Sequence, residues 1–285
     1  MAFSLPAYLR RLALPASLAD GGARAATREL LTTITSAHAR AIPFENLDVV
    51  LRRPIDTSLN AVAAKLVDSA RGGYCFEQNV LLAAALNALG FTAAPLLCRV
   101  RWGKAPDAET PFTHLALRVR ASDAREYISD VGFAGSNSTH PVEIGAGEER
   151  LPEGAFRTAE GGAGARAGYT ALQLRVRGEW RDLYVWRAGE TASDADIALS
   201  NFWSYASPSA RFTTSFFVAR VVGDERHHIL DGAYVVRRGL DGDAAVEEEA
   251  IADEARLRAL LGGVFGIDAP AGSVEAWAAA YRRRA

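Results

Sequence analysis

The stretch RGGYCFEQNVLLAAALNALG (residues 71–90) places a single cysteine, Cys75, between a pair of glycines and a long apolar run. The apolar run predicts a helix that begins at or just after Cys75 and that Gly90 brings to an end. Gly72 and Gly73 let the backbone turn sharply and bring neighbouring groups close to the sulfur. The stretch therefore raises the question of whether Cys75 is a packed core residue or a reactive thiol.

The hydrophobic period differs on the two sides of this stretch. Residues 1–90 are predicted to be helical, with further helices in TRELLTTITSAHAR and after a possible cap at Ser58. From about residue 91 the period changes to two, which is typical of strands. THLALRVR and REYISDVGF predict two strands of a hairpin, with ASDA as the turn between them. YTALQLRVR and EWRDLYVW predict a second hairpin around Gly178.

The last third is mixed. DADIALSNFWSYAS predicts a helix, FTTSFFVARVV and HHILDGAYVVRR predict strands, and EEEAIADEARLRALLGG and SVEAWAAAYRRR predict closing helices. Because the strands cluster in the middle and do not alternate regularly with helices, we predict an α+β fold over a doubly wound sheet.

Composition excludes several classes of protein. The net charge of -2 over 285 residues offers no basic surface for nucleic acid. The amino terminus is a poor signal peptide, and the longest apolar stretch, residues 80–98, is too interrupted to span a membrane. Two cysteines give neither a disulfide framework nor a four-ligand zinc site. We expect a soluble, cytoplasmic protein that needs no metal and is a monomer or a homodimer.

Cys75 and Cys98 differ in their local context. A helix N-terminus directs unpaired N–H groups and a positive dipole end at Cys75, which favours the thiolate form. Free cysteines are nevertheless among the most buried residues, so this context alone fits a nucleophile and a structural thiol equally. Cys98, inside the apolar FTAAPLLCRV, is expected to be a packing residue.

A nucleophilic cysteine is usually served by a histidine, and the chain has five. His38 continues an apolar helical stripe and is expected to be a core residue, whereas His140, His227 and His228 are expected to be solvated. His114 differs because it lies on a predicted strand, on the face opposite Leu115 and its apolar neighbours. We therefore select His114 as the partner of Cys75.

The predicted hairpin also selects a carboxylate. If Arg120 pairs with Arg125, position 114 falls opposite position 131, and a one-residue bulge or a diagonal places His114 beside Asp130. A carboxylate there can hold the imidazole in one tautomer, as in triad catalysis, although Asp130 fits an ordinary strand-end acid equally well. We predict a catalytic group of Cys75, His114 and Asp130.

These residues carry a resemblance to a known family. RGGYCFEQN resembles the nucleophile motif of the arylamine N-acetyltransferases, and IPFENLD (residues 42–48), THLALRV (113–119) and ISDVGF (128–133) are similar to its other landmarks in the same order. SPSARFTTSF (207–216) is similar to its carboxy-terminal segment. The resemblance covers nearly the whole chain, and the four segments in register are highly specific.

The resemblance implies a fold, an activity and a donor. It implies a helical bundle at 1–90 with the nucleophile, a β-barrel at 91–200 with the histidine and the aspartate, and an α/β lid at 201–285. It also implies a papain-like Cys-His-Asp site between domains and transfer of acetyl from acetyl-coenzyme A to arylamines, arylhydrazines or N-hydroxyarylamines. Acetyl-coenzyme A is a substrate here, as the acyl donor, and no permanently bound cofactor is expected.

Further residues receive roles from the same resemblance. It implies that Glu45 and Arg71 form a buried ion pair that supports the glycine turn. It also implies a set of residues that line the acyl and aryl pocket or contact coenzyme A: Thr113, Gly132, Phe133, Trp203 and Ser209. Ala134 departs from the family pattern, which often has a further glycine after Asp-Val-Gly-Phe, so the shape of the acceptor pocket is open.

Three alternatives to acetyl transfer are considered. A relative with the same triad could form an amide from a larger acyl thioester and so release a polyketide chain onto an amine. A transglutaminase-like cysteine hydrolase shares the order Cys, His, Asp but would ignore coenzyme A. A non-catalytic binding module is disfavoured because all three catalytic residue types are present.

Overall fold

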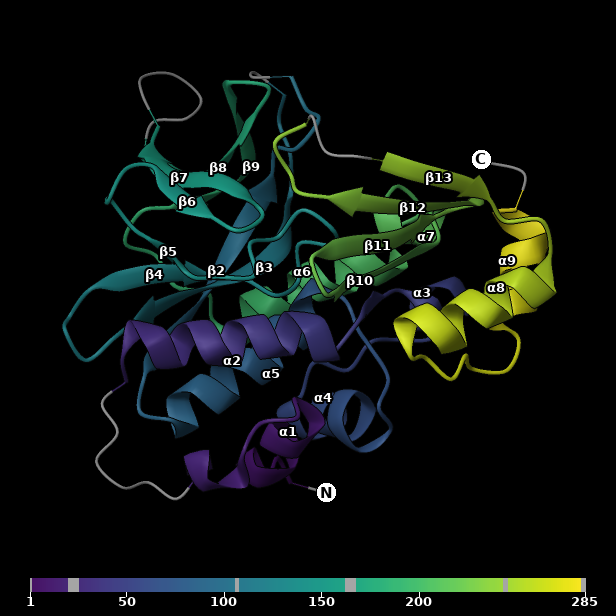
Figure 1. The fold of residues 1–285 in the computed structure, drawn as a ribbon, viewed down its shortest axis with the longest axis horizontal. Coiled ribbons are helices and arrows are strands. Elements are labelled where there is room, and N and C mark those ends of the chain that lie inside the picture. The colour runs from purple at the N-terminus through teal and green to yellow at the C-terminus, as the bar shows by residue number, and fades with distance from the viewer. Residues whose placement is uncertain (1, 20–25, 106–107, 162–167, 243–245, 283–285) are drawn as a thin grey trace.

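The computed structural model describes residues 2–19, 26–105, 108–161, 168–242 and 246–282. Helices form the N-terminal part, an eight-stranded antiparallel sheet forms a nearly closed barrel, and a second sheet with helices forms the C-terminal part. Figure 1 shows the N-terminal helices along one side of the barrel and the C-terminal part beside both. The predicted α+β class is confirmed.

The N-terminal part consists of two longer helices, α2 and α5, and several short ones. Its elements are α1 (Leu5–Arg11), η1 (Ala16–Ala19), α2 (Arg28–Ala41), α3 (Leu47–Val50), α4 (Leu59–Ala63), η2 (Ala64–Asp68) and α5 (Cys75–Ala88). Thr27 caps α2 by accepting a hydrogen bond from the Leu30 N–H at 3.3 Å. Helix α5 begins at Cys75, and Gly90 follows its end with a φ of 89°, as the sequence predicted.

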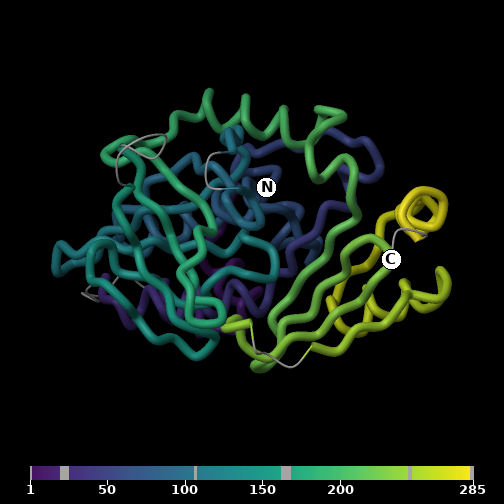
Figure 2. The backbone as a smooth tube through the Cα atoms, turned by 90° about the horizontal axis from the view of Figure 1, so that it is seen from above, coloured from purple at the N-terminus to yellow at the C-terminus, as the bar shows by residue number. Residues whose placement is uncertain are grey.

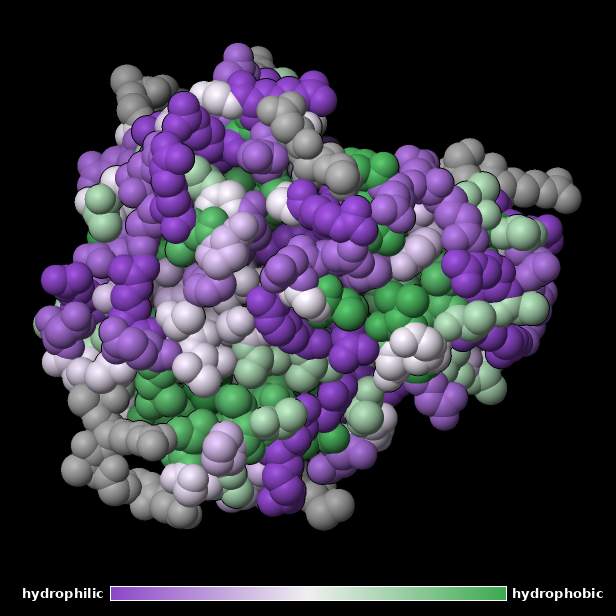
Figure 3. Space-filling view, viewed as in Figure 1, coloured by the Kyte–Doolittle hydropathy of each residue, from purple (hydrophilic) through white to green (hydrophobic). Residues whose placement is uncertain are grey.

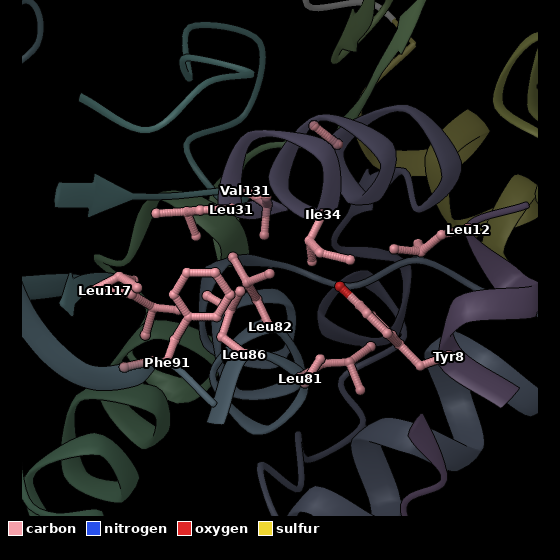
Figure 4. Close-up of a cluster of buried hydrophobic side chains, with 14 of the residues drawn as sticks. Tyr8, Leu12, Leu31, Ile34, Leu81, Leu82, Leu86, Phe91, Leu117 and Val131 are labelled. Carbon is pink, nitrogen blue, oxygen red and sulfur yellow. The ribbon is translucent and has the colours of Figure 1, made fainter. Parts of the chain in front are cut away.

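The N-terminal core is built between α2, α5 and one face of the barrel. Figure 4 shows Leu31 and Ile34 of α2 above Leu81 and Leu82 of α5, with Val131 beside them. All of these side chains are buried, as the apolar stripes of the two helices require. This core holds the start of α5 at a defined distance from the barrel strands.

The barrel sheet has the strand order β5-β4-β3-β2-β9-β8-β7-β6. Its strands are β2 (Thr92–Val100), β3 (Phe112–Arg120), β4 (Glu126–Ser129), β5 (Val142–Glu143), β6 (Glu149–Leu151), β7 (Gly154–Glu160), β8 (Tyr169–Val176) and β9 (Glu179–Arg187). Both predicted hairpins are present, as β3–β4 and β8–β9. Contacts between β5 and β7 bring the two ends of the sheet together.

The register of the β3–β4 hairpin differs by one residue from the prediction. Arg120 pairs with Glu126 rather than with Arg125, and the ladder ends at the Leu117–Ser129 pair. The turn is one residue longer because Ala124 adopts a left-handed φ of 66°. Asp130 therefore follows the paired part of β4 instead of lying within it.

The C-terminal part contains a five-stranded sheet, β1-β10-β11-β12-β13, with helices packed on both of its faces. Its elements are α6 (Asp194–Ala206), α7 (Arg211–Thr214), β10 (Phe217–Val222), β11 (Glu225–Leu230), β12 (Ala233–Arg238), β13 (Val246–Ala250), α8 (Glu254–Leu260), η3 (Leu261–Phe265) and α9 (Ser273–Ala280). The prediction that EEEA belongs to a helix is wrong, because it lies in β13. Pairing with β12 supplies hydrogen bonds that override the helix propensity of glutamate.

Two features tie the parts together. Strand β1 (Phe44–Glu45) comes from the N-terminal region but pairs with β10 of the C-terminal sheet. Helix α6 runs from the end of the barrel strands towards the C-terminal sheet, and Figure 2 shows it along one edge of the molecule. Since α6 includes residue 200, the expected boundary between residues 200 and 201 lies inside a helix.

Among the residues that the structure describes, no helix is both long and apolar enough to cross a bilayer. On the face in Figure 3, apolar side chains lie in separate patches among hydrophilic ones. Isolated patches of this kind are ordinary on a protein surface.

Candidate active site

The turn before Cys75 requires glycine because other atoms approach it closely. A Cβ at Gly72 would lie 2.2 Å from the Pro43 carbonyl oxygen, and one at Gly73 would lie 2.7 Å from Glu77 Oε2. Gly73 also accepts a hydrogen bond from the Glu45 N–H at 3.1 Å. Neither glycine has a left-handed φ. The glycines therefore allow the IPFEN segment and the first turn of α5 to pack directly against the turn.

Cys75 is the first residue of α5 and is 2% exposed. Glu77 caps the helix, because its carboxylate accepts a hydrogen bond from the Tyr74 N–H at 3.1 Å. The sulfur lies 3.8 Å from the Thr113 carbonyl oxygen at the start of β3. The thiol thus lies between the N-terminus of a helix and the edge of the barrel, beside the strand that carries His114.

His114 and Asp130 form a buried ion pair. His114 Nε2 lies 2.7 Å from Asp130 Oδ2, and both side chains are almost fully buried. Asp130 uses Nε2, so Nδ1 is the ring nitrogen that remains for the cysteine. The carboxylate therefore fixes both the tautomer and the orientation of the imidazole.

The charges of the pair follow from its surroundings. Burial alone would lower the pKa of His114, but the charge and hydrogen bond of Asp130, together with the Cys75 side chain, raise it to about 10. Burial would raise the pKa of Asp130, but the imidazolium and the hydrogen bonds that this carboxylate accepts hold it below its ordinary value. At neutral pH the pair is an imidazolium and a carboxylate.

Asn79 links Asp130 to the helix that carries Cys75. Its Nδ2 donates to Asp130 Oδ1 at 2.9 Å and to the Leu115 carbonyl oxygen at 2.7 Å. The sequence analysis missed this residue, although it lies four positions after Cys75 and hence on the same face of α5. A polar residue one helical turn after the cysteine was a readable signal.

Gly132 packs against Cys75. A Cβ at this position would lie 2.5 Å from Cys75 Cα, and the Gly132 N–H donates to Asp130 Oδ1 at 2.8 Å. No larger residue fits here without displacing α5 or the segment after β4.

Two aromatic rings pack against the imidazole of His114. Phe133 meets His114 edge to face with 5.1 Å between ring centroids, and Tyr184 of β9 lies 4.8 Å from the same ring. Tyr184 is fully buried, and its hydroxyl has no hydrogen-bond partner among the described residues. A small cavity lined in part by Tyr184, Phe133 and Asp130 lies next to it.

Aromatic side chains also surround Cys75. Phe44 and Phe217 belong to its hydrophobic cluster, and Phe212 packs against that cluster. The Phe44 ring lies 5.7 Å from that of Phe212 and 5.6 Å from that of Phe217. The sequence analysis assigned no role to these three residues, which two distant segments bring together.

Five charged side chains form a network beneath the glycine turn. Arg71 bonds Glu45 at 2.6 Å, and it also contacts Asp48 at 3.1 Å. Lys65 joins Asp48 at 2.7 Å and Glu77 at 2.8 Å. The expected Glu45–Arg71 contact is thus one part of a larger network that reaches the helix cap beside Cys75.

Other predicted residues lie further out or in different surroundings. Trp203 is half-buried on α6 and Ser209 is exposed, with its hydroxyl 3.0 Å from that of Ser207. The expectation that His227 is solvated is wrong: it is buried and bonds the Tyr234 hydroxyl at 2.6 Å. His140 and His228 are half-buried, also contrary to expectation.

His38 is the buried core residue that the sequence predicted. Its ring bonds the Tyr8 hydroxyl at 2.8 Å and Gln78 Oε1 at 2.7 Å. Burial lowers the pKa of His38 to about 4, so that it remains neutral.

Comparison with known proteins extends these observations. The family model for N-acetyltransferases matches residues 27–274 and places the chain among the acyltransferases. The chain is 36% identical to arylamine N-acetyltransferase of Mycolicibacterium smegmatis over 94% of its own length and 93% of that protein. It is 35% identical to arylamine N-acetyltransferase / N-hydroxyarylamine O-acetyltransferase of Salmonella typhimurium, over 85% and 83% of the two chains.

Solved structures agree with the sequence matches. The M. smegmatis arylamine N-acetyltransferase superposes with a TM-score of 0.87 at 33% identity, covering 98% of this chain and 99% of that one. Arylamine N-acetyltransferase of Mycobacterium marinum in complex with CoA gives a TM-score of 0.84 at 32% identity, over 96% and 98% of the two chains. The chain belongs to the arylamine N-acetyltransferase family.

Proposed function

We propose that the protein transfers acetyl from acetyl-coenzyme A to arylamines, arylhydrazines or N-hydroxyarylamines through an acetyl group carried on Cys75. The observation that supports this most directly is the buried His114–Asp130 pair beside a cysteine at a helix N-terminus. Family membership and the relative solved with CoA support the choice of donor.

In the first half-reaction, the Cys75 thiolate attacks the thioester carbonyl carbon. The backbone N–H of Cys75, at the start of α5, is the first candidate donor to the oxyanion that develops. The carbon–sulfur bond to coenzyme A then breaks, and the imidazolium of His114 gives its proton to the departing thiolate. The products are acetyl-Cys75, neutral His114 and coenzyme A as a thiol.

In the second half-reaction, the amine attacks the acetyl carbon. Neutral His114 accepts the proton of the amine, the bond to Cys75 breaks, and the thiolate–imidazolium pair is restored. An aromatic amine suits this step because it is an uncharged nucleophile at neutral pH. The rings around Cys75, from Phe44, Phe212 and Phe217, offer an apolar surface for it.

We propose roles for the remaining residues from the same resemblance. Gly132 and Phe133 contact Cys75 and His114, and we assign them to the acyl and aryl pocket, whereas Thr113 is assigned to contacts with coenzyme A or the acceptor. Trp203 and Ser209 are assigned to contacts with coenzyme A or the acceptor. We further propose functional domains at 1–90, 91–200 and 201–285, although α6 joins the last two.

Intact-mass analysis after mixing with acetyl-coenzyme A, without an acceptor, tests the proposal. We expect one acetyl group on Cys75 that disappears when an aromatic amine or hydrazine is added. Cys75→Ser and His114→Ala should abolish the adduct. No adduct on the wild-type protein would overturn the proposal, and a faster reaction with a long-chain acyl thioester would indicate the related amide synthase activity instead.

A further inference from the structure

One buried carboxylate outside the triad, Glu153, connects three separate parts of the molecule. It lies in the tight turn between β6 and β7 of the barrel and is 9% exposed. A buried carboxylate is costly unless its oxygens are well paired, so its partners show what it organises.

The first group of partners lies in the segment that follows the catalytic acid. Glu153 Oε1 accepts hydrogen bonds from Ser138 Oγ and from Thr139 Oγ1, both at 3.1 Å, and also from the Thr139 N–H. Glu153 Oε2 lies 3.4 Å from His140 Nδ1. The hydrogen bond of His140, that of the Thr139 N–H and the charge of Arg226 lower the pKa of Glu153 to about 2, against the effect of its burial.

The second group belongs to the C-terminal sheet. Arg226 of β11 is 3% exposed; its guanidinium lies 3.8 Å from Glu153 Oε1 and donates to Asn137 Oδ1 at 3.4 Å. The Leu240 N–H, just after β12, donates to the Glu153 carbonyl oxygen at 2.7 Å. Glu153 therefore ties residues 137–140 to the sheet that provides Phe217.

Two small cavities border this segment. One small cavity lies between it and the barrel, lined in part by Asn137, Ser138 and Phe133. A second lies between it and the C-terminal sheet, lined in part by Asn137 and Arg226. The cavities leave fewer packing contacts on these two sides of the segment. The polar contacts of Glu153 therefore contribute to fixing its position.

The triad, in contrast, has its own supports. His114 lies on β3 and pairs with Asp130, which follows β4. Asn79 of α5 donates a hydrogen bond to Asp130. Among the contacts of the described residues, none of these three side chains bonds Glu153. Phe133 lies four residues before Asn137 in the chain, its carbonyl oxygen accepts a hydrogen bond from the Ser136 N–H, and its ring packs on that of His114.

We propose that Glu153 is a positioning residue for the acceptor side of the site, holding residues 133–140 against the barrel and coupling them to Arg226. This inference rests on the proposed acetyl transfer. In the ping-pong scheme, kcat/KM for each substrate depends only on the half-reaction of that substrate. An effect on the acceptor side of the site can therefore be measured separately from an effect on the donor side.

The experiment compares Glu153→Gln with wild type, using acetyl-coenzyme A as donor and 4-methoxyaniline as acceptor. We expect kcat/KM for the amine to fall about tenfold, within the range of coupling energies between contacting residues, and kcat/KM for acetyl-coenzyme A to change less than about twofold. Arg226→Lys should give the same split with a smaller effect, and it serves if Glu153→Gln folds poorly. Glu143→Gln is the matched control, since it removes a barrel carboxylate that pairs with Arg28 and Arg125.

The outcomes separate the possibilities. An equal fall in both kcat/KM values would show a general structural role and overturn the inference. Variants indistinguishable from wild type and from Glu143→Gln would overturn it as well. If wild-type Cys75 takes up no acetyl group, the proposed function itself fails.

Discussion

The two cysteines of the chain are equally buried but lie in opposite electrostatic surroundings. Cys75 is 2% exposed and Cys98 is 0% exposed. Cys98 lies within β2, in register with His114 on β3, and its thiol points to the Leu96 carbonyl oxygen at 3.5 Å. Burial, reinforced by the charge of Asp130, raises the pKa of Cys98 well above its ordinary value.

Cys75 has the features that Cys98 lacks. It begins a helix, and its side chain contributes to the raised pKa of His114. Cys98 is buried and lies beside His114 in the strand ladder, so these two features alone do not single out Cys75 for the nucleophilic role that we propose. What distinguishes Cys75 is a positive field from the helix end and an imidazolium kept charged by a carboxylate.

The largest expected effect tests the comparison directly. Cys75→Ser should lower kcat/KM by about 10⁴-fold or more, because the alcohol is not ionised by these groups, whereas Cys98→Ala should retain activity within about threefold. Steady-state acetyl transfer measures both. An acetyl group found on Cys98, or one that persists in Cys75→Ser, would contradict the assignment.

Loss of the carboxylate should have the next largest effect. Asp130→Asn should reduce kcat/KM by about 10³–10⁴-fold, by analogy with the aspartate of serine proteases, because the imidazole loses its charge partner and its tautomer. Asp123→Asn, an exposed acid in the turn of the same hairpin, is the control. Comparable activity of the two variants, with near-UV circular dichroism unchanged, would remove Asp130 from the mechanism.

The charge network supports the surroundings of Cys75, because it reaches the helix cap at Glu77. Arg71→Gln should lower the free energy of unfolding by about 3–5 kcal/mol, because it leaves the fully buried Glu45 carboxylate without its strongest partner. Arg256→Gln, which breaks an exposed pair with Glu249, should cost less than about 1 kcal/mol. Urea denaturation of both variants checks this difference, and equal losses would show that the network does not support the turn.

The smallest effect concerns the pH dependence of stability. The pKa of His114 is about 10 in the folded state and about 6.5 in the unfolded state. At a pH between these two values, the folded state therefore keeps a proton that the unfolded state has lost. The stability that this proton contributes is fully present below pH 6.5 and is lost as the pH rises towards 10.

The measurement uses a Cys75→Ser background, which has no thiol beside His114. Between pH 7 and 9, Cys75→Ser should lose stability with a steeper slope than Cys75→Ser/His114→Gln, by at most about 1.4 kcal/mol per pH unit. Parallel stability curves would show that His114 does not retain its proton in the folded protein.

Local patterns allowed much of the fold to be predicted. The apolar run after Cys75, the stop at Gly90 and the period-two segments depend on interactions between residues near one another in the chain, so helix α5 and both barrel hairpins were predictable. Errors arose where distant partners compete with local propensity. EEEA joined a sheet because β12 was there to pair with it, and the β3–β4 register moved by one residue because the turn used Ala124 in a left-handed conformation.

For the site, the sequence by itself indicated the groups that we propose as catalytic: a cysteine at a helix start, a histidine on the polar side of a strand, and an acid after the next strand. Only the tertiary structure decided that Asn79 joins the acid to the helix, that Tyr184 lies on the imidazole, and that Glu153 contacts Arg226. Hydrophobic periodicity reports which face of an element is buried, whereas these contacts depend on which buried faces meet. That choice is made by packing and by the pairing of buried polar groups across the whole chain.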